Sequence, residues 1–146
     1  MNTYLFGWNP VKYPWPELRD EIHQVQQGIP SKETWTCASH KKVKIGDRAF
    51  FVHVGKEPRG LFGSGYISST PFKGKNAKGR DCYRVTVTFD ALLDPDFSPI
   101  LTLELLNMSA LSKQNWTPQS SGISIQAELV EELELLWADF LENRGH

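Results

Sequence analysis

The chain of 146 residues lacks most of the features that mark metal sites, disulfide scaffolds and membrane spans. Its two cysteines, Cys37 and Cys82, are too few for a disulfide scaffold, and neither belongs to a CxxC motif or a Cys/His array with zinc spacing. No apolar run approaches the roughly 18 residues that a membrane helix needs, and no basic lead precedes the first apolar residues. We therefore expect a cytoplasmic protein with no membrane partner, no metal and no cofactor.

Catalytic motifs are also missing. There is no GxSxG or P-loop sequence, and no HExxH or HxH arrangement among His23, His40, His53 and His146. Cys37 and His40 could form a nucleophile pair, but two such residues in a loop usually have no joint role. Asp94 and Asp96 are typical of a turn and not of an acid and base pair. The sequence favours a binding module over an enzyme.

What the chain does have is a charge that is divided along its length. Residues 32–84 hold 12 Lys and Arg against 4 Asp and Glu, which is +8, and the other residues hold 4 against 13, which is −9. The net charge of −1 conceals this division. A basic face on an otherwise acidic domain would suit a polyanion such as nucleic acid. The alternative is that these charges only solvate separate faces.

Apolar patterns predict one α+β domain over residues 1–146, a small barrel of mixed strands with flanking helices. The organising stretch is a hairpin with a wide turn at residues 44–66, in which Gly63 and Gly65 would leave one strand face open to something flat. Residues 29–42 and the Gly- and Lys-rich residues 72–81 are expected to be loops. The strands of one curved sheet are expected at residues 4–6, 48–54, 61–68 and 83–89, and helices at 17–27 and 128–142. Trp137 would face the core.

Four tryptophans are predicted to lie off the periodic elements: Trp8, Trp15, Trp35 and Trp116. Several could converge on one pocket, because stacking a base on aromatic rings contributes roughly 1–3 kcal/mol. Alternatively, each ring could plug one end of the barrel, and for Trp8 and Trp15 both interpretations stay open. Function is favoured for Trp35 and Trp116, whose neighbours supply donors and acceptors: Thr36, Ser39, Gln119, Ser120 and Ser121.

The order of several segments resembles an EVE domain of the PUA-like superfamily, of the type at the N-terminus of modification-dependent HNH restriction endonucleases. The segments are YLF before WNP, Trp35-Thr36, GDRAFFVHVGKEPRGLFGSGYISSTPF, YRVTVTFDALLDP and NWTPQSSGISI. The resemblance spans nearly the whole chain. It implies a PUA-like pseudo-barrel related to the YTH reader fold, in which a flipped 5-methylcytosine or 5-hydroxymethylcytosine lies in an aromatic cage.

The resemblance also implies site residues. Trp35 matches the tryptophan that opens the cage segment, and Trp116 with Gln119 and Ser121 matches the second wall. The whole expected cage is Trp8, Trp35, Thr36, Ser39, Trp116, Gln119 and Ser121. The expected phosphate contacts are Lys41, Lys42, Lys44, Arg59, Lys73, Lys75 and Lys78.

The expected partner is modified double-stranded DNA, together with an HNH nuclease domain in a longer parent or a partner protein. The nuclease region that follows the family's domain is absent from this sequence, so its cleavage activity is not carried over. Two alternatives stay open: a reader of modified RNA, and a sensor or enzyme that acts on a free nucleotide or another small molecule in the same pocket. The sequence does not name the modification, because discrimination of one methyl or hydroxyl depends on side-chain placement.

Overall fold

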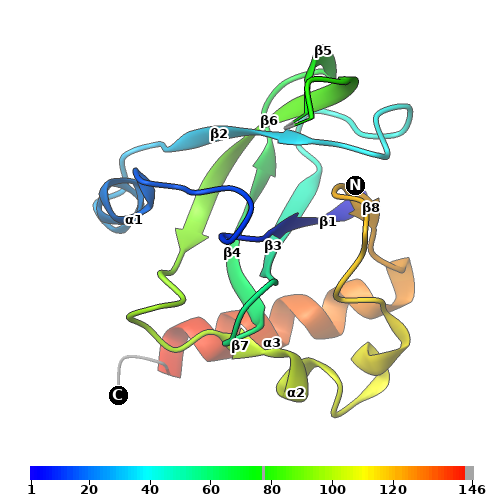
Figure 1. Cartoon of the computed structure of the whole chain (residues 1–146). Helices are drawn as coiled ribbons and strands as arrows, with labels where there is room; N and C mark the ends of the chain where they lie inside the picture. The colour runs from blue at the N-terminus through cyan, green and yellow to red at the C-terminus, as the bar shows by residue number, and fades with distance from the viewer. Residues whose placement is uncertain (77, 144–146) are drawn as a thin grey trace.

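The computed structural model describes residues 1–76 and 78–143, and its centre is one curled sheet (Figure 1). The strand order is β2-β6-β4-β3-β1-β8, with β5 added to β6 and β7 added to β4. The neighbours are antiparallel except for β1 and β3, which are parallel. The strands are β1 (Thr3–Trp8), β2 (Lys32–Thr36), β3 (Arg48–His53), β4 (Gly60–Ile67), β5 (Phe72–Lys75), β6 (Asp81–Leu92), β7 (Leu101–Thr102) and β8 (Ile123–Ser124).

Helices flank this sheet, so the chain is an α+β pseudo-barrel. In Figure 1, α1 (Leu18–Gln26) lies at one side of the sheet, and α2 (Leu103–Leu106) and α3 (Val130–Asn143) lie beneath it, opposite β5. Short 3₁₀ turns at Ala110–Lys113 and Ala127–Leu129 lead into the last part of the chain. The predicted helices and the single curved sheet are confirmed. No helix within the described residues is long and apolar enough to cross a membrane.

The hairpin of β3 and β4 forms the core of the molecule, as its apolar residues predict. Every residue of β3 is buried, and β4 is buried except for Tyr66. The predicted strand at residues 4–6 is also central, because β1 pairs with β3 on one side and with β8 on the other. The core therefore lies where segments from both ends of the chain meet the middle hairpin.

The prediction of an open glycine face on β4 is wrong, because β6 covers it. A Cβ atom on Gly65 would lie 2.3 Å from the carbonyl oxygen of Thr88, and one on Gly63 would lie 3.1 Å from Leu92. The glycines let the backbones of β4 and β6 approach closely where the register between them shifts at Ser64 and Gly65. No ligand can use that face.

Two predicted loops are in fact partly strands. Residues 32–36 form β2, in which half-buried Glu33 and Trp35 alternate with exposed Lys32 and Thr34. This alternation is too short, at five residues, to predict a strand from the sequence. Residues 72–75 form β5, which pairs with the start of β6. The backbone ladder thus orders a segment that has little to bury, and residue 77, within that predicted loop, lies outside the described residues.

The last helix is fastened to the sheet by one tryptophan and one arginine. Trp137 is buried, as predicted, and its Nε1 donates to Ser64 Oγ at 2.9 Å. Arg48 of β3 donates to Asp90 Oδ2 at 2.8 Å and to Glu134 Oε2 of α3 at 2.9 Å. Because the guanidinium of Arg48 is almost fully buried, these bonds join the barrel to α3.

A candidate base-binding site and its basic surroundings

Three of the four singled-out tryptophans meet inside one end of the barrel. We call Trp8, Trp15, Trp35, Phe51, Phe62 and Phe89 the tryptophan cluster. The ring centroid of Trp15 lies 5.5 Å from that of Trp8 and 5.6 Å from that of Trp35, in both cases edge to face. Trp35 also lies 5.0 Å from Phe51. These spacings are those of favourable aromatic pairs.

The prediction that these tryptophans lie off the strands is wrong for two of the three. Trp8 ends β1 and Trp35 is in β2, so only Trp15 comes from a loop. Each indole has a partner inside the protein: Trp35 Nε1 donates to the carbonyl of Gly7 at 3.0 Å, and Trp8 Nε1 donates to that of Tyr13 at 2.7 Å. Trp15 and Trp35 remain half-buried. Their ring faces and edges, and not their N–H groups, are left to meet a ligand.

Trp116 does not belong to the cluster, and its placement as a second cage wall is wrong. Its side chain is 3% exposed, and its Nε1 donates to the carbonyl of Leu111 at 2.9 Å. It makes no aromatic pair with Trp35 among the described residues. Trp116 therefore packs the irregular segment before β8 against the core, as a structural residue.

Serines from two segments form a polar rim beyond Trp35. The backbone N–H groups of Ala38 and Ser39 donate to the carbonyls of Ser121 and Gly122, and the N–H of Gly7 donates to Ser121 Oγ at 3.0 Å. Gly122 has φ of +79°, and a Cβ on it would lie 2.7 Å from the Cα of Cys37. Only glycine fits this contact, so the segments that hold Ser39 and Ser121 are brought together as predicted.

Of the other two expected cage residues, only Thr36 differs from the prediction. Thr36 follows Trp35 in β2, so its side chain lies on the opposite face of the strand, where its Oγ1 accepts from Arg84 Nη1 at 3.2 Å. The side chain of Thr36 therefore lies on the outer face of the barrel and not in the expected cage. Gln119 is exposed in the turn before Ser121.

A pair of glutamates lies behind Trp15. Glu21 is buried, accepts from Trp15 Nε1 at 2.5 Å and accepts from Ser31 Oγ at 2.7 Å. The pKa of Glu33 is raised to about 7, first by burial and then by its hydrogen bond to Glu21 and by the charges of Glu21 and Glu17. Near neutral pH the Glu33 carboxyl is therefore partly protonated, and Glu21 fastens Trp15 to α1 through its hydrogen bond.

A pocket of about 260 Å³ opens beside the cluster, on the side of α1. Trp8 and Trp15 form one wall, and the opposite wall carries Arg19, which lies over the Phe97 ring at 3.9 Å and pairs with Asp94 at 3.3 Å. Asp96 also lines the pocket and pairs with Lys56 at 3.2 Å. This side pocket joins aromatic rings to charged groups of both signs.

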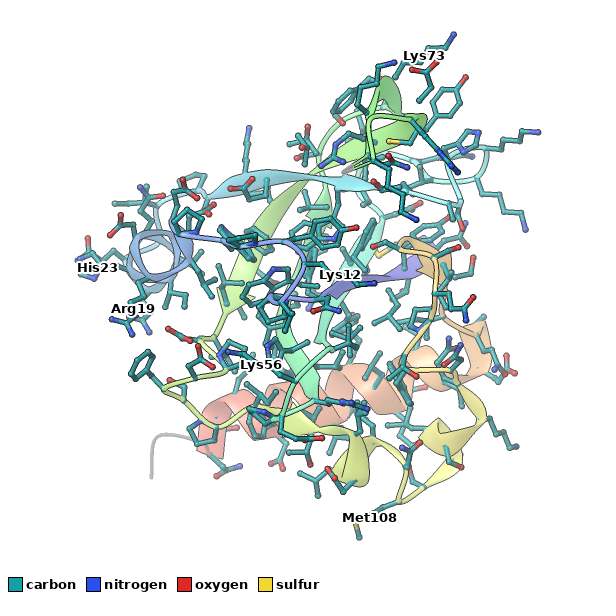
Figure 2. The ribbon with its side chains drawn as sticks, viewed as in Figure 1. Lys12, Arg19, His23, Lys56, Lys73 and Met108 are labelled. Carbon is teal, nitrogen blue, oxygen red and sulfur yellow. The ribbon has the colours of Figure 1, made fainter. Side chains whose placement is uncertain are left out.

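Five of the seven expected phosphate contacts are exposed and make no ion pair within the described part of the chain: Lys41, Lys42, Lys44, Lys73 and Lys78. Lys75 is exposed but pairs with Asp81. The first three lie between β2 and β3, and the others lie on the β5–β6 hairpin. The two segments adjoin, because His40 stacks on Tyr83, which pairs with Lys73. We call these six lysines the basic end; Figure 2 shows Lys73 pointing away from the body.

Arg59 does not belong to the basic end, and its grouping with the lysines is wrong. It precedes β4, beside β7 and α2, and its carbonyl accepts from the N–H of Leu103. Lys44 adjoins the other end of β4, since Gly46 bonds to Ile67, and eight strand residues span about 25 Å. Arg59 instead pairs with Glu57 at 3.6 Å.

Sequence reasoning missed an aromatic pair on the basic end. The rings of His40 and Tyr83 stack with centroids 4.0 Å apart and planes at 14°. Tyr83 is 37% exposed, and Phe72 nearby is 38% exposed. The alternation of residues 83–89 places Tyr83 on the same strand face as buried Val85 and Val87, but nothing in the sequence predicts that His40 lies against it.

The structure gives no support to a nucleophile pair of Cys37 and His40. Burial raises the pKa of the Cys37 thiol, which keeps it protonated, and His40 stacks on Tyr83. His53 is buried, its Nδ1 lies against the carbonyl oxygen of Pro58, and burial lowers its pKa. Within residues 1–76 and 78–143, no group of three or more His, Cys, Asp or Glu side chains is placed to hold a metal ion.

Comparison with solved structures shows that this fold is shared. A hypothetical protein from Leishmania major is similar with a TM-score of 0.67 and 15% identity, over 95% of this chain and 96% of that one. A protein from Pseudomonas syringae gives 0.63 and 16%, over 92% and 98%. A protein from Rhodopseudomonas palustris gives 0.60 and 20%, over 94% of each. Neither the models of protein families nor the curated proteins give a match to this chain.

Proposed function

We propose that the protein is a non-catalytic reader of a modified nucleobase, 5-methylcytosine or 5-hydroxymethylcytosine in DNA, and that it is an EVE domain. The base would leave its duplex and contact Trp35 at the mouth of the barrel. The single observation that carries the proposal is the convergence of Trp8, Trp15 and Trp35 in one cluster beside a polar rim. Such a site offers a surface for stacking and groups for reading a base edge.

The surroundings of the cluster support a nucleic acid as the partner. The loop after Trp35 carries Lys41, Lys42 and Lys44, so a strand whose base reached Trp35 would pass unpaired lysines. Phosphate contacts supply most of the affinity in such complexes, and base contacts supply the specificity. The reader is proposed to act in the cytoplasm, where two free cysteines stay reduced, and beside a nuclease domain.

The side pocket favours a second candidate, a sensor of a free nucleotide or similar small molecule. Its 260 Å³ would hold a single base. Asp94 and Asp96 could accept from an exocyclic amine, as carboxylates do with cytosine N4. A free nucleotide would meet Arg19 but none of the lysines of the basic end, so its binding would depend little on salt.

A binding panel tests the proposal. Matched DNA and RNA oligonucleotides carry cytosine, 5-methylcytosine, 5-hydroxymethylcytosine or N6-methyladenine, and fluorescence anisotropy gives Kd at two salt concentrations. We expect one modified cytosine in DNA to bind best, with log affinity falling by roughly 0.9 per log unit of salt for each phosphate neutralised. Preference for RNA would transfer the proposal to RNA. Equal binding to all of them would refute it, and a flat salt response would favour the small-molecule sensor.

The variants Trp35→Ala and Trp35→Phe locate the site. Trp35→Ala should remove the preference for the modified base and leave weak, salt-dependent binding, whereas Trp35→Phe should keep part of the preference. A thermal melt accompanies both, because truncation of a packed tryptophan costs roughly 3–5 kcal/mol when it is fully buried. Trp116→Phe is the matched control, which should leave the preference intact. A folded Trp35→Ala that still discriminates would mean that the base is read elsewhere.

A further inference from the structure

An apolar groove lies at the opposite end of the molecule from the lysines, and neither the cluster nor the barrel uses it. It has a volume of about 720 Å³ and runs between the segment of α2 and the outer side of α3. We call it the acidic groove. It is lined by Leu105, Met108, Ser109, Glu128, Glu131, Glu132, Leu135, Leu136 and Asp139.

Three of the four apolar residues of the groove, Leu105, Met108 and Leu135, lie outside the core, and only Leu136 packs against it. Leu133 and Trp137 already bury the inner side of α3, and Leu106 buries that of α2. Leu135 is nevertheless 67% exposed and Met108 is 77% exposed. Figure 2 shows Met108 pointing into solvent at the lowest part of the molecule. Large apolar side chains that gather outside a complete core are typical of an interaction surface.

The charges around the groove are of one sign and lack partners. Glu128, Glu131, Glu132 and Asp139 make no ion pair within the described residues, whereas Glu134, on the other side of α3, pairs with Arg48. The four acids extend along about 16 Å of chain at helical rise. They form no metal-binding group with their described neighbours. An occupant should therefore carry several positive charges along its length.

The size of the exposed apolar surface indicates a single segment. The exposed parts of Leu105, Met108 and Leu135 amount to a few hundred Å², below the roughly 800 Å² that each partner of a stable complex contributes. A second copy of this chain would also bring the same four acids against themselves. An amphipathic helix fits instead, because it can insert apolar anchors between two helical segments and place Lys or Arg along both rims.

We propose that the acidic groove binds a basic amphipathic helix of a partner protein, with its apolar side on Met108 and Leu135 and its cationic side chains on the four acids. This interaction is independent of the proposed reading of a base. Nucleic acid would be repelled here by the same acids, so the two ligands would occupy different ends of the domain at once.

The test uses the whole chain and two labelled peptides of about 18 residues, long enough to form a helix. Both peptides have the same leucine side, and one has lysines where the other has glutamates. Fluorescence anisotropy should show that the lysine peptide binds at least about tenfold more tightly. The double change Glu131→Lys with Glu132→Lys leaves two acids and two lysines in the groove, so it should abolish this preference. Glu142→Lys, the same charge change on α3 outside the groove, should alter Kd less than about twofold.

Apolar contacts are tested separately with Met108→Ser and Leu135→Ser. Both residues are exposed, so folding should be unchanged, and each variant should weaken the lysine peptide about five- to tenfold. Equal affinity for the two peptides, or no response to either serine change, would overturn the proposal. Concentration-dependent dimerisation that Leu135→Ser abolishes would also overturn it, in favour of a second copy. Saturating oligonucleotide should not displace the peptide.

Discussion

The basic end and the acidic groove have opposite charge, but they also differ in how their apolar groups are used. At the basic end, the half-buried ring of His40 stacks on the exposed ring of Tyr83, between exposed lysines. At the acidic groove, aliphatic side chains are exposed on and beside α2 and α3, between carboxylates that make no ion pair within the described residues. Aromatic rings among lysines suit the bases and phosphates of a nucleic acid. An aliphatic groove suits the apolar face of a helix. The charge division along the sequence thus becomes a division in space, with a different ligand chemistry at each end.

The exceptions to this division are informative, because residues 32–84 also place basic residues away from the basic end. Lys56 and Arg59 each pair with a nearby carboxylate, Asp96 and Glu57. Arg48 pairs with two, Asp90 and Glu134. These three basic residues are therefore compensated by carboxylates, unlike five of the six lysines of the basic end.

The largest expected effect on stability comes from Arg48 of β3, whose ion pair with Glu134 joins the sheet to α3. Arg48→Met should reduce the free energy of unfolding by about 3 kcal/mol, because it leaves two carboxylates without their shared partner and loses their bonds to a buried guanidinium. Urea unfolding at pH 7 measures this. Glu134→Gln should cost less than about 1 kcal/mol, since Glu134 is partly exposed. Equal costs for the two variants would mean that α3 is fastened mainly through this one pair.

A smaller effect should come from the glutamates behind Trp15. The folded-state pKa of Glu33 is about 7 and its ordinary value is 4.5, so the folded state binds more protons between these pH values. Stability should therefore be highest below pH 4.5, as far as this group is concerned, and should fall as pH rises through 7. Glu33→Gln should stabilise the protein by about 2 kcal/mol at pH 8, after allowance for partial exposure.

Thermal melts from pH 4 to 8 compare Glu33→Gln with the unchanged protein, and Glu142→Gln, a change at an exposed glutamate of α3, is the control. The unchanged protein should lose stability over this range relative to Glu33→Gln, whose profile should be flatter. Parallel profiles would show that the pKa of Glu33 is not raised in the folded state.

The β5–β6 hairpin shows how far the sequence predicts such a surface. Its lysines are evident, and residues 83–89 alternate clearly, but pairing of β5 with β6 depends on backbone bonds that any residue can make. Likewise β2 was missed because Trp35 and Glu33 reveal their alternation only once β6 lies beside them. By contrast, the Trp137 helix and the buried β3 were predictable, because their apolar periodicity is long and unambiguous.

The candidate site was predictable in part for the same reason. Trp8 and Trp35 stand out by residue type, but residue type does not distinguish them from Trp116, which lies outside the cluster and bonds to Leu111. Thr36 was misplaced because a neighbour in sequence is on the opposite face of a strand. The glutamate pair and the His40–Tyr83 stack join residues 12 and 43 positions apart, a proximity that only the fold creates.

A smaller effect than those of Arg48 and Glu33 is expected when Lys73 and Lys78 are both changed to alanine. This double change tests whether the basic end binds phosphates. Affinity for modified and unmodified oligonucleotides should fall equally, roughly tenfold at low salt, and the slope of log affinity against log salt should decrease by about 1–2. Anisotropy titrations at several salt concentrations measure both. A selective loss for the modified base would place the reading group on this hairpin.

The smallest effect is expected for Lys75→Ala on the same hairpin. Because Lys75 pairs with Asp81, its charge is already partly compensated, so its loss should weaken oligonucleotide binding less than about threefold and stability by less than about 0.5 kcal/mol. The same titrations and a thermal melt suffice. A loss of affinity as large as that for the double change at Lys73 and Lys78 would mean that the Lys75–Asp81 ion pair opens when nucleic acid binds.

The position of β1 between β3 and β8 has a consequence for how the protein reaches its fold. Leu5 of β1 lies opposite Ile123 of β8, so this pairing must close a loop of well over a hundred residues before it contributes any stability. Contacts of such long range make folding slow, on the millisecond to second scale. Until β8 arrives, one side of β1 has unpaired backbone groups and can recruit a strand from another chain. Refolding at high protein concentration should therefore yield more aggregate than refolding at low concentration.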